Sequence, residues 1–295
     1  MSTKKLVFTV PDDCDGMTAR VFLRKRADVS ARIITLLKRE KDGILRDKKN
    51  LRTVDVLRAG DVITLNLPED KSEIIPVEGG LDIIFEDDYL IALDKPASMP
   101  VHPTKKHQLD TLANRLAYLQ RKRGESYVFR ALNRLDKDTS GLVLVAKDKY
   151  TAMALKNRAF KKYYAVCEGV VTGDDVISSP IRLSDGSKIK RVCAPNGQPA
   201  VTHYEALRTD GSHTLLRLWL ETGRTHQIRC HMADIGHPLA GDDMYGGSLG
   251  IIARQALHCC ECGFTHPISG EKVTLGSPLP EDIRAAFPSL CEGID

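Results

Sequence analysis

Apolar residues recur in two kinds of pattern along this chain, and each pattern predicts a set of elements. Continuous or alternating apolar runs predict strands at 62–67, 81–85, 89–93, 142–146 and 163–170. Helical patterns predict helices at 18–27, from Ser30 to Gly43, at 109–122, at 150–160, and from Thr225 to Gly236. Helices and strands are therefore expected along the whole chain.

The pattern over residues 12–67 is that of a compact unit. Ser30 suits the N-cap of its second helix, because the hydroxyl can accept a hydrogen bond from a free backbone N–H. Gly43 suits the end of that helix, and the alternating strand 62–67 follows. Residues 68–80 are rich in charge, Pro and Gly, as linkers are. We therefore predict an N-terminal module at 1–70, a linker at 71–80 and a main domain at 81–295.

Charge is unevenly distributed along the chain. The first 70 residues hold 15 Lys and Arg against 11 Asp and Glu, whereas the remaining residues hold 28 of each sign. The whole formal excess of +4 therefore lies in the N-terminal module. A basic module joined to a neutral body indicates an electrostatic contact with phosphate groups.

Composition is that of an ordinary globular protein, and no stretch approaches the roughly 18 consecutive apolar residues of a membrane span. The first residues lack the apolar core and cleavage site of a signal peptide, which predicts a cytoplasmic protein. The eight cysteines show no paired framework. Cys259, Cys260 and Cys262 are clustered, but neighbours on a strand point to opposite faces. We therefore expect reduced thiols and no metal site.

A dense polar turn lies directly before the apolar run 142–146. Residues 133–141 read Asn-Arg-Leu-Asp-Lys-Asp-Thr-Ser-Gly, and charged loops held by a rigid strand often carry catalytic groups. The turn resembles the signature of the ribosomal large-subunit type of pseudouridine synthase, His-Arg-Leu-Asp-x-x-Thr-Ser-Gly, whose Asp is catalytic. Asn133 stands where that pattern has His. The resemblance makes Asp136 the catalytic residue.

Further motifs of the same family follow in the family's order. The Lys-Lys-Tyr-Tyr-Ala run resembles its Lys-x-Tyr-x-Ala element, which makes Tyr163 the active-site aromatic, with Tyr164 as the alternative. Residues 220–229 contain Gly-Arg-Thr-His-Gln-Ile-Arg, and the resemblance implies that Arg229 pairs with the catalytic Asp. Residues 236–246 match the family's Gly-His-Pro-x-x-Gly-Asp and Tyr-Gly elements, which we expect to shape the cleft. The basic residues of these motifs that we predict to contact RNA are Arg134, Arg224 and His226.

The resemblance covers roughly residues 81–280 and implies an α+β fold. The expected architecture is a mixed, mainly antiparallel sheet with flanking helices and a central cleft. The implied reaction isomerises uridine to pseudouridine in RNA: the base leaves its glycosidic nitrogen, rotates, and rejoins the ribose through carbon 5. Nothing is oxidised and no group is imported, so no cofactor or metal is expected. Three roles stay open for Asp136: attack on the sugar, attack on the base, or help in forming an unsaturated sugar.

The N-terminal module resembles a small α+β unit, the alpha-L RNA-binding module named after the fourth small-subunit ribosomal protein. The shared features are a helix, a basic helix, a short strand and an Ala-Gly-Asp turn, although residues 45–50 replace the usual Val-Asn-Gly turn. Its predicted RNA contacts are Arg20, Arg24, Arg32 and Lys38. The expected partner is structured RNA, with ribosomal large-subunit RNA first and transfer RNA second. We expect a monomer.

Two other functions fit parts of the sequence. Residues 136–139 also satisfy Asp-x-Asp-x-Thr, the phosphotransfer loop of haloacid-dehalogenase-type phosphatases. That loop needs a buried strand ending directly before the first Asp, whereas here the cleaner apolar run comes after it. The basic module alone would suffice for a non-catalytic RNA-binding protein. That alternative gives no reason for Asp136, Tyr163 and Arg229 to occur together in the family's order.

Overall fold

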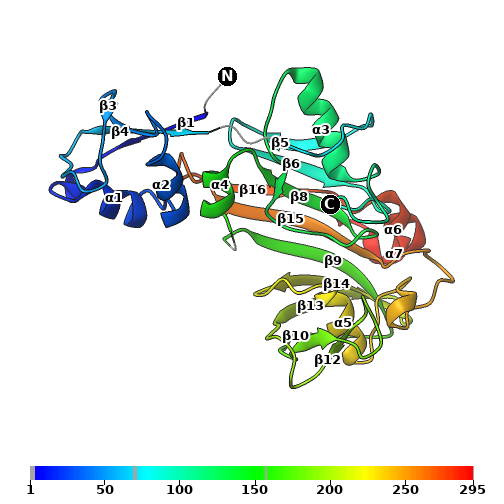
Figure 1. Ribbon diagram of the computed structural model, residues 1–295. Helices are drawn as coiled ribbons and strands as arrows, with labels where there is room; N and C mark the ends of the chain where they lie inside the picture. Colours follow the sequence, from blue (N-terminus) through cyan, green and yellow to red (C-terminus); the bar gives the residue numbers. More distant parts are fainter. Residues whose placement is uncertain (1–3, 69–71, 157, 295) are drawn as a thin grey trace.

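The computed structural model describes residues 4–68, 72–156 and 158–294. It contains a four-stranded sheet in the N-terminal part and a ten-stranded sheet in the rest, each with its own buried core (Figure 1). Helices flank both sheets, and among the described pairings of the large sheet the one between β8 and β15 is parallel. The expected α+β fold with a mainly antiparallel sheet is confirmed.

The small sheet has the strand order β1-β4-β2-β3 and carries two helices. Its elements are β1 (Lys4–Thr9), α1 (Ala19–Lys25), α2 (Ala31–Leu37), β2 (Ile44–Arg46), β3 (Lys49–Asn50) and β4 (Val62–Leu67), with a 3-10 turn at Asp12–Cys14. Ser30 is the predicted N-cap, since its Oγ accepts from the Ile33 amide at 3.0 Å. The expected end at Gly43 is wrong. The helix ends at Leu37 with Lys38 as its C-cap, because the amides of Arg39 and Glu40 then bond to the carbonyls of Leu36 and Leu37 in tight turns.

The large sheet runs through the whole main body of the molecule. Its strand order is β10 (Asp174–Ile177), β13 (Thr202–Thr209), β14 (His213–Leu220), β9 (Phe160–Glu168), β15 (Leu257–Thr265), β8 (Ser140–Ala146), β6 (Leu90–Lys95) and β5 (Asp82–Glu86). Beside this path β7 (Arg130–Ala131) pairs with β8 and β16 (Lys272–Gly276) pairs with β15. A separate two-stranded sheet consists of β11 (Ile181–Leu183) and β12 (Arg191–Cys193). The helices are α3 (Leu112–Arg123), α4 (Lys149–Ala154), α5 (Gln227–Asp234), α6 (Glu281–Ala286) and α7 (Pro288–Cys291).

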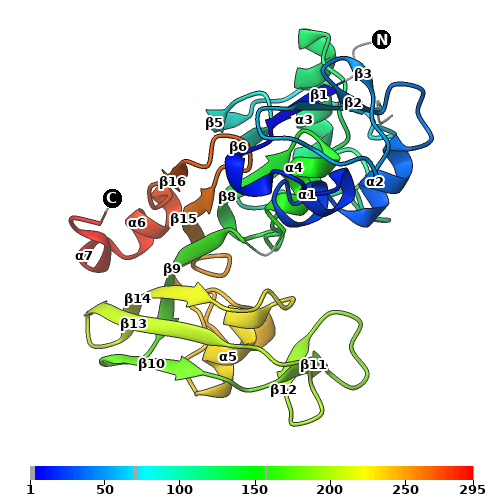
Figure 2. The ribbon, with the colours of Figure 1, turned by 90° about the vertical axis from the view of Figure 1, so that its left-hand side faces the viewer.

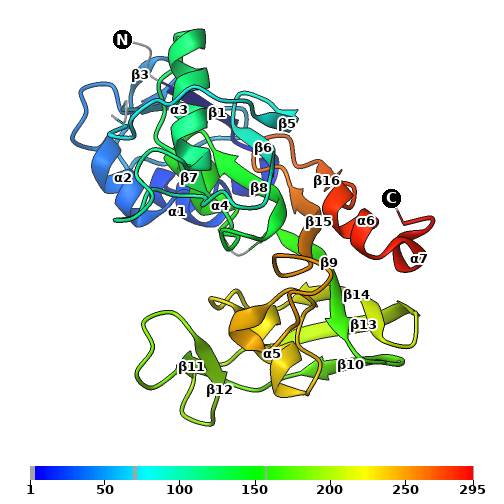
Figure 3. The same cartoon turned by 90° about the vertical axis from the view of Figure 1, so that its right-hand side faces the viewer.

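The sheet has two halves that meet at β9 and β15. Figure 2 and Figure 3 show β5, β6 and β8 with α3 in one half, and β10, β13 and β14 with α5 in the other. The turn 136–139 lies where they meet, because β8 and β15 begin side by side there, with Ser140 opposite His258. Residues distant in sequence from both halves can therefore reach this turn.

The start of β8 is fixed by its own motif residues. Gly141 has φ +110°, and a Cβ at this position would overlap the backbone of Cys259 on β15, so glycine is required. Asn133 is buried, and its side chain bonds to β8 twice: Nδ2 donates to the Leu142 carbonyl and Oδ1 accepts from the Leu144 amide, both at 2.9 Å. The turn is thus held against β8 at both of its ends.

The helix predicted at 150–160 is present but ends earlier than expected. α4 ends at Ala154, and Phe160, the expected last residue of that helix, begins β9 instead. Phe160 lies opposite Gly263 of β15, where a Cβ would overlap the Phe160 ring. Packing of an aromatic ring over a strand glycine favours the extended conformation. Pairing between strands therefore overrides the helical pattern here.

The described part of the predicted linker is held against α3. Residues 72–80 contain no helix or strand, yet they are bonded to Asn114 of α3. The side-chain Nδ2 of Asn114 donates to the Ile75 carbonyl at 2.8 Å, and its main-chain carbonyl accepts from the Val77 amide at 3.1 Å. Arg115 donates to the Gly80 carbonyl at 3.1 Å. Residues 69–71 lie outside the described residues, and the division of the chain at 70 and 80 stays a prediction.

The N-terminal part packs against the main body through α4. Tyr150 and Ala154 of α4 belong to the core of the small sheet, and the Phe8 and Tyr150 rings meet edge to face with centroids 5.7 Å apart. Arg158 also forms an ion pair with Asp28. The contact is partly apolar, so the two parts are packed together rather than joined by the chain alone.

Candidate active site

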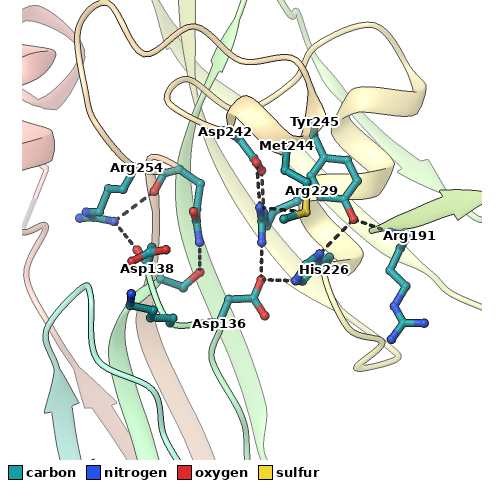
Figure 4. Close-up of polar contacts among 12 residues, drawn as sticks. Asp136, Asp138, Arg191, His226, Arg229, Asp242, Met244, Tyr245 and Arg254 are labelled. Carbon is teal, nitrogen blue, oxygen red and sulfur yellow. Dashed lines mark hydrogen bonds and ion pairs between the residues drawn. The ribbon is translucent and has the colours of Figure 1, made fainter. Parts of the chain in front are cut away.

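Asp136 is held by two basic side chains from α5 and its N-cap. Arg229 Nη1 lies 3.0 Å from Asp136 Oδ2, and His226 Nε2 lies 3.7 Å from the same oxygen (Figure 4). The Asp136 side chain is 27% exposed, whereas that of Arg229 is 7% exposed. A buried cation thus fixes one oxygen of a carboxylate that solvent can still reach.

The orientation of Arg229 is set by a second carboxylate, Asp242. Arg229 Nε and Nη2 donate to the two oxygens of Asp242 at 2.6 and 2.8 Å, and Asp242 is 1% exposed. Burial alone would lower the pKa of Arg229, but the hydrogen bond and charge of Asp242, and then Asp136, raise it. Arg229 therefore stays a cation with its planar fork fixed. Sequence reasoning gave residues 236–246 a shaping role and missed Asp242 as this partner.

α5 begins differently from the sequence prediction. Thr225 is not its N-cap; that position belongs to His226, which has a left-handed φ of 56°. The side chain of Gln227 fixes this start, because its Oε1 accepts from the Arg224 amide at 2.9 Å and its Nε2 donates to the Val201 carbonyl at 2.9 Å. The helix is therefore tied to the strand ends at β13 and β14, and its first turn faces Asp136.

The two tyrosines of β9 point to opposite faces of the sheet. Tyr163 is buried in the main core, and burial, followed by the nearby Cys259 and Cys262 thiols and by Asp136, raises its pKa well above the usual range. Tyr164 packs instead against the separate core formed with α6 and α7. Tyr163 is thus the one within electrostatic reach of Asp136.

Residues 138–140 are held by the loop before β15. Arg254 Nη1 donates to the Asp138 carbonyl at 3.1 Å and Nη2 donates to Ser140 Oγ at 3.4 Å, while Gln255 Nε2 donates to Thr139 Oγ1 at 3.2 Å. Arg254 is in turn paired with Asp282 of α6. This loop carries no motif that sequence reasoning recognised, so both residues were missed.

Lys95 holds the next carbonyl of the same turn. Its side chain is fully buried, and Nζ donates to the Lys137 carbonyl at 3.0 Å and to the Pro96 carbonyl at 2.8 Å. Burial lowers the pKa of Lys95 to about 7, against the opposing charges of Asp138, Asp136 and Asp94. The turn around Asp136 is therefore fixed from several directions.

Known proteins resemble the chain over most of its length. A family model described as RNA pseudouridylate synthase matches residues 89–234. An uncharacterised RNA pseudouridine synthase of Bacillus subtilis is 39% identical, over 78% of this chain and 79% of the relative. A protein named ribosomal large subunit pseudouridine synthase D, from Neisseria meningitidis serogroup A, is 37% identical over 95% of this chain and 80% of the relative. The chain belongs to the RNA pseudouridylate synthase family.

Solved structures agree with this membership. The human RNA pseudouridylate synthase domain containing 4 is 26% identical with a TM-score of 0.56, over 71% of this chain and 92% of the other. The human RNA pseudouridylate synthase domain containing 1 is 26% identical with a TM-score of 0.57, over 72% and 89%. The family comprises isomerases acting on RNA uridines, so the phosphatase alternative is wrong. The structure gives the reason, since β8 begins after Asp136.

Some of the residues that we predicted to contact RNA lie in the main body of this synthase, and the others lie in its N-terminal part. Arg134 and Arg224 are exposed beside the Asp136 site, and Arg224 Nε donates to the Pro199 carbonyl at 3.0 Å. His226 is half-buried and contacts Asp136 rather than pointing to solvent. The exposed residues of the N-terminal helices lie on the separate small sheet unit: Arg20, Arg24, Arg32 and Lys38.

Metal-binding geometry is absent from the part of the synthase that the structure describes. Within residues 4–68, 72–156 and 158–294 no group of three or more His, Cys, Asp or Glu side chains is placed to hold a metal ion. The clustered cysteines are all buried, with Cys259 Sγ and Cys262 Sγ 3.9 Å apart. None of the described helices is long and apolar enough to cross a membrane.

Proposed function

We propose that the chain converts uridines of ribosomal large-subunit RNA to pseudouridine, with Asp136 as its essential carboxylate. One observation carries the site: a buried Arg229, locked by Asp242, holds one oxygen of the partly exposed Asp136. Relatives named ribosomal large subunit pseudouridine synthase D, at 34–41% identity, support the RNA class.

The geometry suits a carboxylate that must act in its ionised form. The contacts of Arg229 and His226 both go to Oδ2 of Asp136, so Oδ1 receives neither. The guanidinium, 3.0 Å away, fixes the direction of the carboxylate. Oδ1 is then the oxygen we assign to the reaction, whether it attacks the sugar, attacks the base, or takes a proton from the sugar. The bond that breaks joins the ribose to the base nitrogen, and the bond that forms joins it to carbon 5.

Tyr163 is our candidate for the aromatic that contacts the uracil. A tyrosine phenol is protonated at neutral pH, and the raised pKa of Tyr163 keeps it so. Its ring can stack on the base and its hydroxyl can donate a hydrogen bond. A uridine in structured RNA must leave its stack to reach Asp136. We assign the backbone contacts that hold such an RNA to Arg134 and Arg224 beside the site. The monomeric state and the cytoplasmic location stay predictions.

The decisive experiment measures tritium release from RNA that contains 5-tritiated uridine. Carbon 5 loses its hydrogen when it joins the ribose, so release reports the isomerisation. We expect release by the wild type with and without EDTA, and none by Asp136→Asn, while RNA binding persists. Asp138→Asn is the matched control, because it neutralises the other carboxylate of the turn. Arg254 contacts Asp138 through the main-chain carbonyl, which the substitution leaves in place. It should retain turnover.

The substrate class is tested in the same assay. We expect fragments of ribosomal large-subunit RNA to release tritium faster than transfer RNA at equal concentration. Two results would contradict the assignment of Asp136 as the essential carboxylate. One is tritium release by Asp136→Asn, and the other is loss of release in Asp138→Asn while Asp136→Asn keeps it. A preference for transfer RNA would contradict the substrate and leave the reaction in place.

A further inference from the structure

The hydroxyl of Tyr245 lies between two partners at the edge of the site. Tyr245 ends the 3-10 turn Asp243–Tyr245 and is 9% exposed. Its oxygen accepts a hydrogen bond from the Arg191 amide of β12 at 2.8 Å and lies 3.0 Å from Nδ1 of His226 (Figure 4). Among residues 4–68, 72–156 and 158–294 these are its two hydrogen-bond partners.

The single proton of this hydroxyl determines where the His226 proton sits. The Arg191 amide can only donate, so the phenol oxygen accepts there and its own proton is free for Nδ1. A neutral imidazole that accepts at Nδ1 carries its proton on Nε2. If Nδ1 donated instead, the phenol proton would lack an acceptor in this buried position, which costs about 1–3 kcal/mol.

The surroundings of His226 favour its neutral form. Burial lowers the pKa of its imidazole, against the opposing charge of Asp136. The Tyr245 ring is also fixed, because the Arg229 guanidinium lies over it at 5.1 Å from the ring centroid and the Lys190 ammonium at 5.6 Å. The hydroxyl therefore has little freedom to turn away from His226.

We propose that Tyr245 is a positioning residue that fixes His226 in the tautomer whose Nε2–H faces the carboxylate of Asp136. Oδ2 of Asp136 then faces two N–H groups, one from Arg229 at 3.0 Å and one from His226 at 3.7 Å. His226 then presents an N–H to the carboxylate from 3.7 Å, which is beyond hydrogen-bond distance, and does not take a proton from it. The inference rests on the proposed role of Asp136 and adds a chain of contacts that runs from β12 through Tyr245 to the reacting group.

The tautomer can be read directly in the full chain without RNA. Long-range proton–nitrogen correlation spectra of the ¹⁵N-labelled protein distinguish protonated from unprotonated ring nitrogens, and loss of one signal set in His226→Gln assigns that residue. We expect an unprotonated Nδ1 and a protonated Nε2. Tyr245→Phe removes the donor, so the His226 signals should shift toward a mixture of tautomers. Tyr204→Phe, a tyrosine buried to the same 9%, should leave them unchanged.

Kinetics supply the second readout. In the Tyr245→Phe mixture fewer molecules direct Nε2–H at Asp136, which lies 3.7 Å away. We therefore expect kcat to fall, by about ten-fold at most, the worth of a full charge-assisted hydrogen bond, while KM for RNA changes little. His226→Gln places an amide N–H where Nε2–H lies, so it should retain more kcat than His226→Asn, although asparagine suits the left-handed backbone better.

Each result decides the proposal. A wild-type spectrum with the proton on Nδ1, unchanged His226 signals in Tyr245→Phe, or His226→Asn more active than His226→Gln would overturn it. The spectra need no turnover. A chain with the expected tautomer but no tritium release would therefore contradict the proposed function and not the tautomer.

Discussion

Lys95 is a fully buried lysine at the base of the Asp136 turn, and its charge state is linked to folding. Burial lowers its pKa in the folded chain to about 7, from an ordinary value of 10.5. Between these two values the unfolded chain binds a proton that the folded chain releases. The free energy of unfolding therefore rises with pH across this window, and the cost of burying the ammonium is fully present below it.

We predict that Lys95→Met removes this pH dependence. From pH 7 to pH 9 the wild type should gain on the order of 2 kcal/mol of unfolding free energy relative to the variant. Urea unfolding of both proteins at the two pH values measures the difference. Lys122→Met, which changes an exposed lysine of α3, is the control and should follow the wild type. Parallel pH profiles for wild type and Lys95→Met would show that the buried lysine does not titrate in this range.

Single residues also show where sequence reasoning reached the site and where it stopped. Asp136 and Arg229 could be named because each lies in a motif, and the resemblance supplied their pairing. Asp242 and Tyr245 also lie in motif elements, but their partners could not be named, and Arg254 lies in no motif. The roles of all three depend on contacts across turns and loops that no local pattern encodes. Asp242 had a visible signal, since it is the Asp of the Gly-His-Pro-x-x-Gly-Asp element.

At the scale of elements, helix α6 near the C-terminus is coupled to the Asp136 turn. Arg254 is 8% exposed and joins the two, because it pairs with Asp282 of α6 at 2.6 Å and donates to the Asp138 carbonyl and Ser140 Oγ. The carboxylate of Asp282 is half exposed, so the ion pair is weaker than a fully buried one. Its main effect is on the direction of the guanidinium.

We predict that Asp282→Asn lowers kcat about ten-fold, because a misdirected Arg254 no longer holds residues 138–140 in place. The unfolding free energy should fall by about 1 kcal/mol, as expected for loss of a partly exposed pair. Tritium release and urea unfolding measure the two effects. Glu281→Gln, on the neighbouring exposed position of α6, should change neither. Loss of stability with unchanged kcat would reduce Arg254 to a purely structural link.

Element predictions failed where distant pairing decides the conformation. The strands β4, β6 and β8 match their apolar runs, because burial within one sheet is written into the local pattern. The helix expected at 150–160 ends early because β9 pairs with β15, and α5 lacks its Thr225 cap because Gln227 bonds to the strand ends instead. In each case the partner that decides the conformation lies far away in the sequence: β15 for β9, and the Val201 carbonyl for Gln227.

At the scale of the whole molecule, the basic N-terminal unit is packed against α4 rather than tethered loosely. Tyr150 and Ala154 of α4 complete its core. Removing residues 1–70 would expose this apolar surface, so a deletion would mix loss of charge with loss of packing. Neutralising exposed basic residues in the full chain separates the two effects.

We therefore predict the outcome of paired charge removals. Arg20→Gln with Arg24→Gln on α1, or Arg32→Gln on α2 with Lys38→Gln at its C-cap, should weaken binding to structured RNA. Each lost phosphate contact should flatten the slope of log affinity against log salt by about 0.7–0.9. Turnover at saturating RNA should persist, because the site around Asp136 is untouched. Arg121→Gln with Lys122→Gln on α3 removes the same charge from another exposed surface and is the control. Equal salt slopes in all three double variants would show that the α1 and α2 residues are ordinary solvated surface, and that the RNA is held by the main body alone.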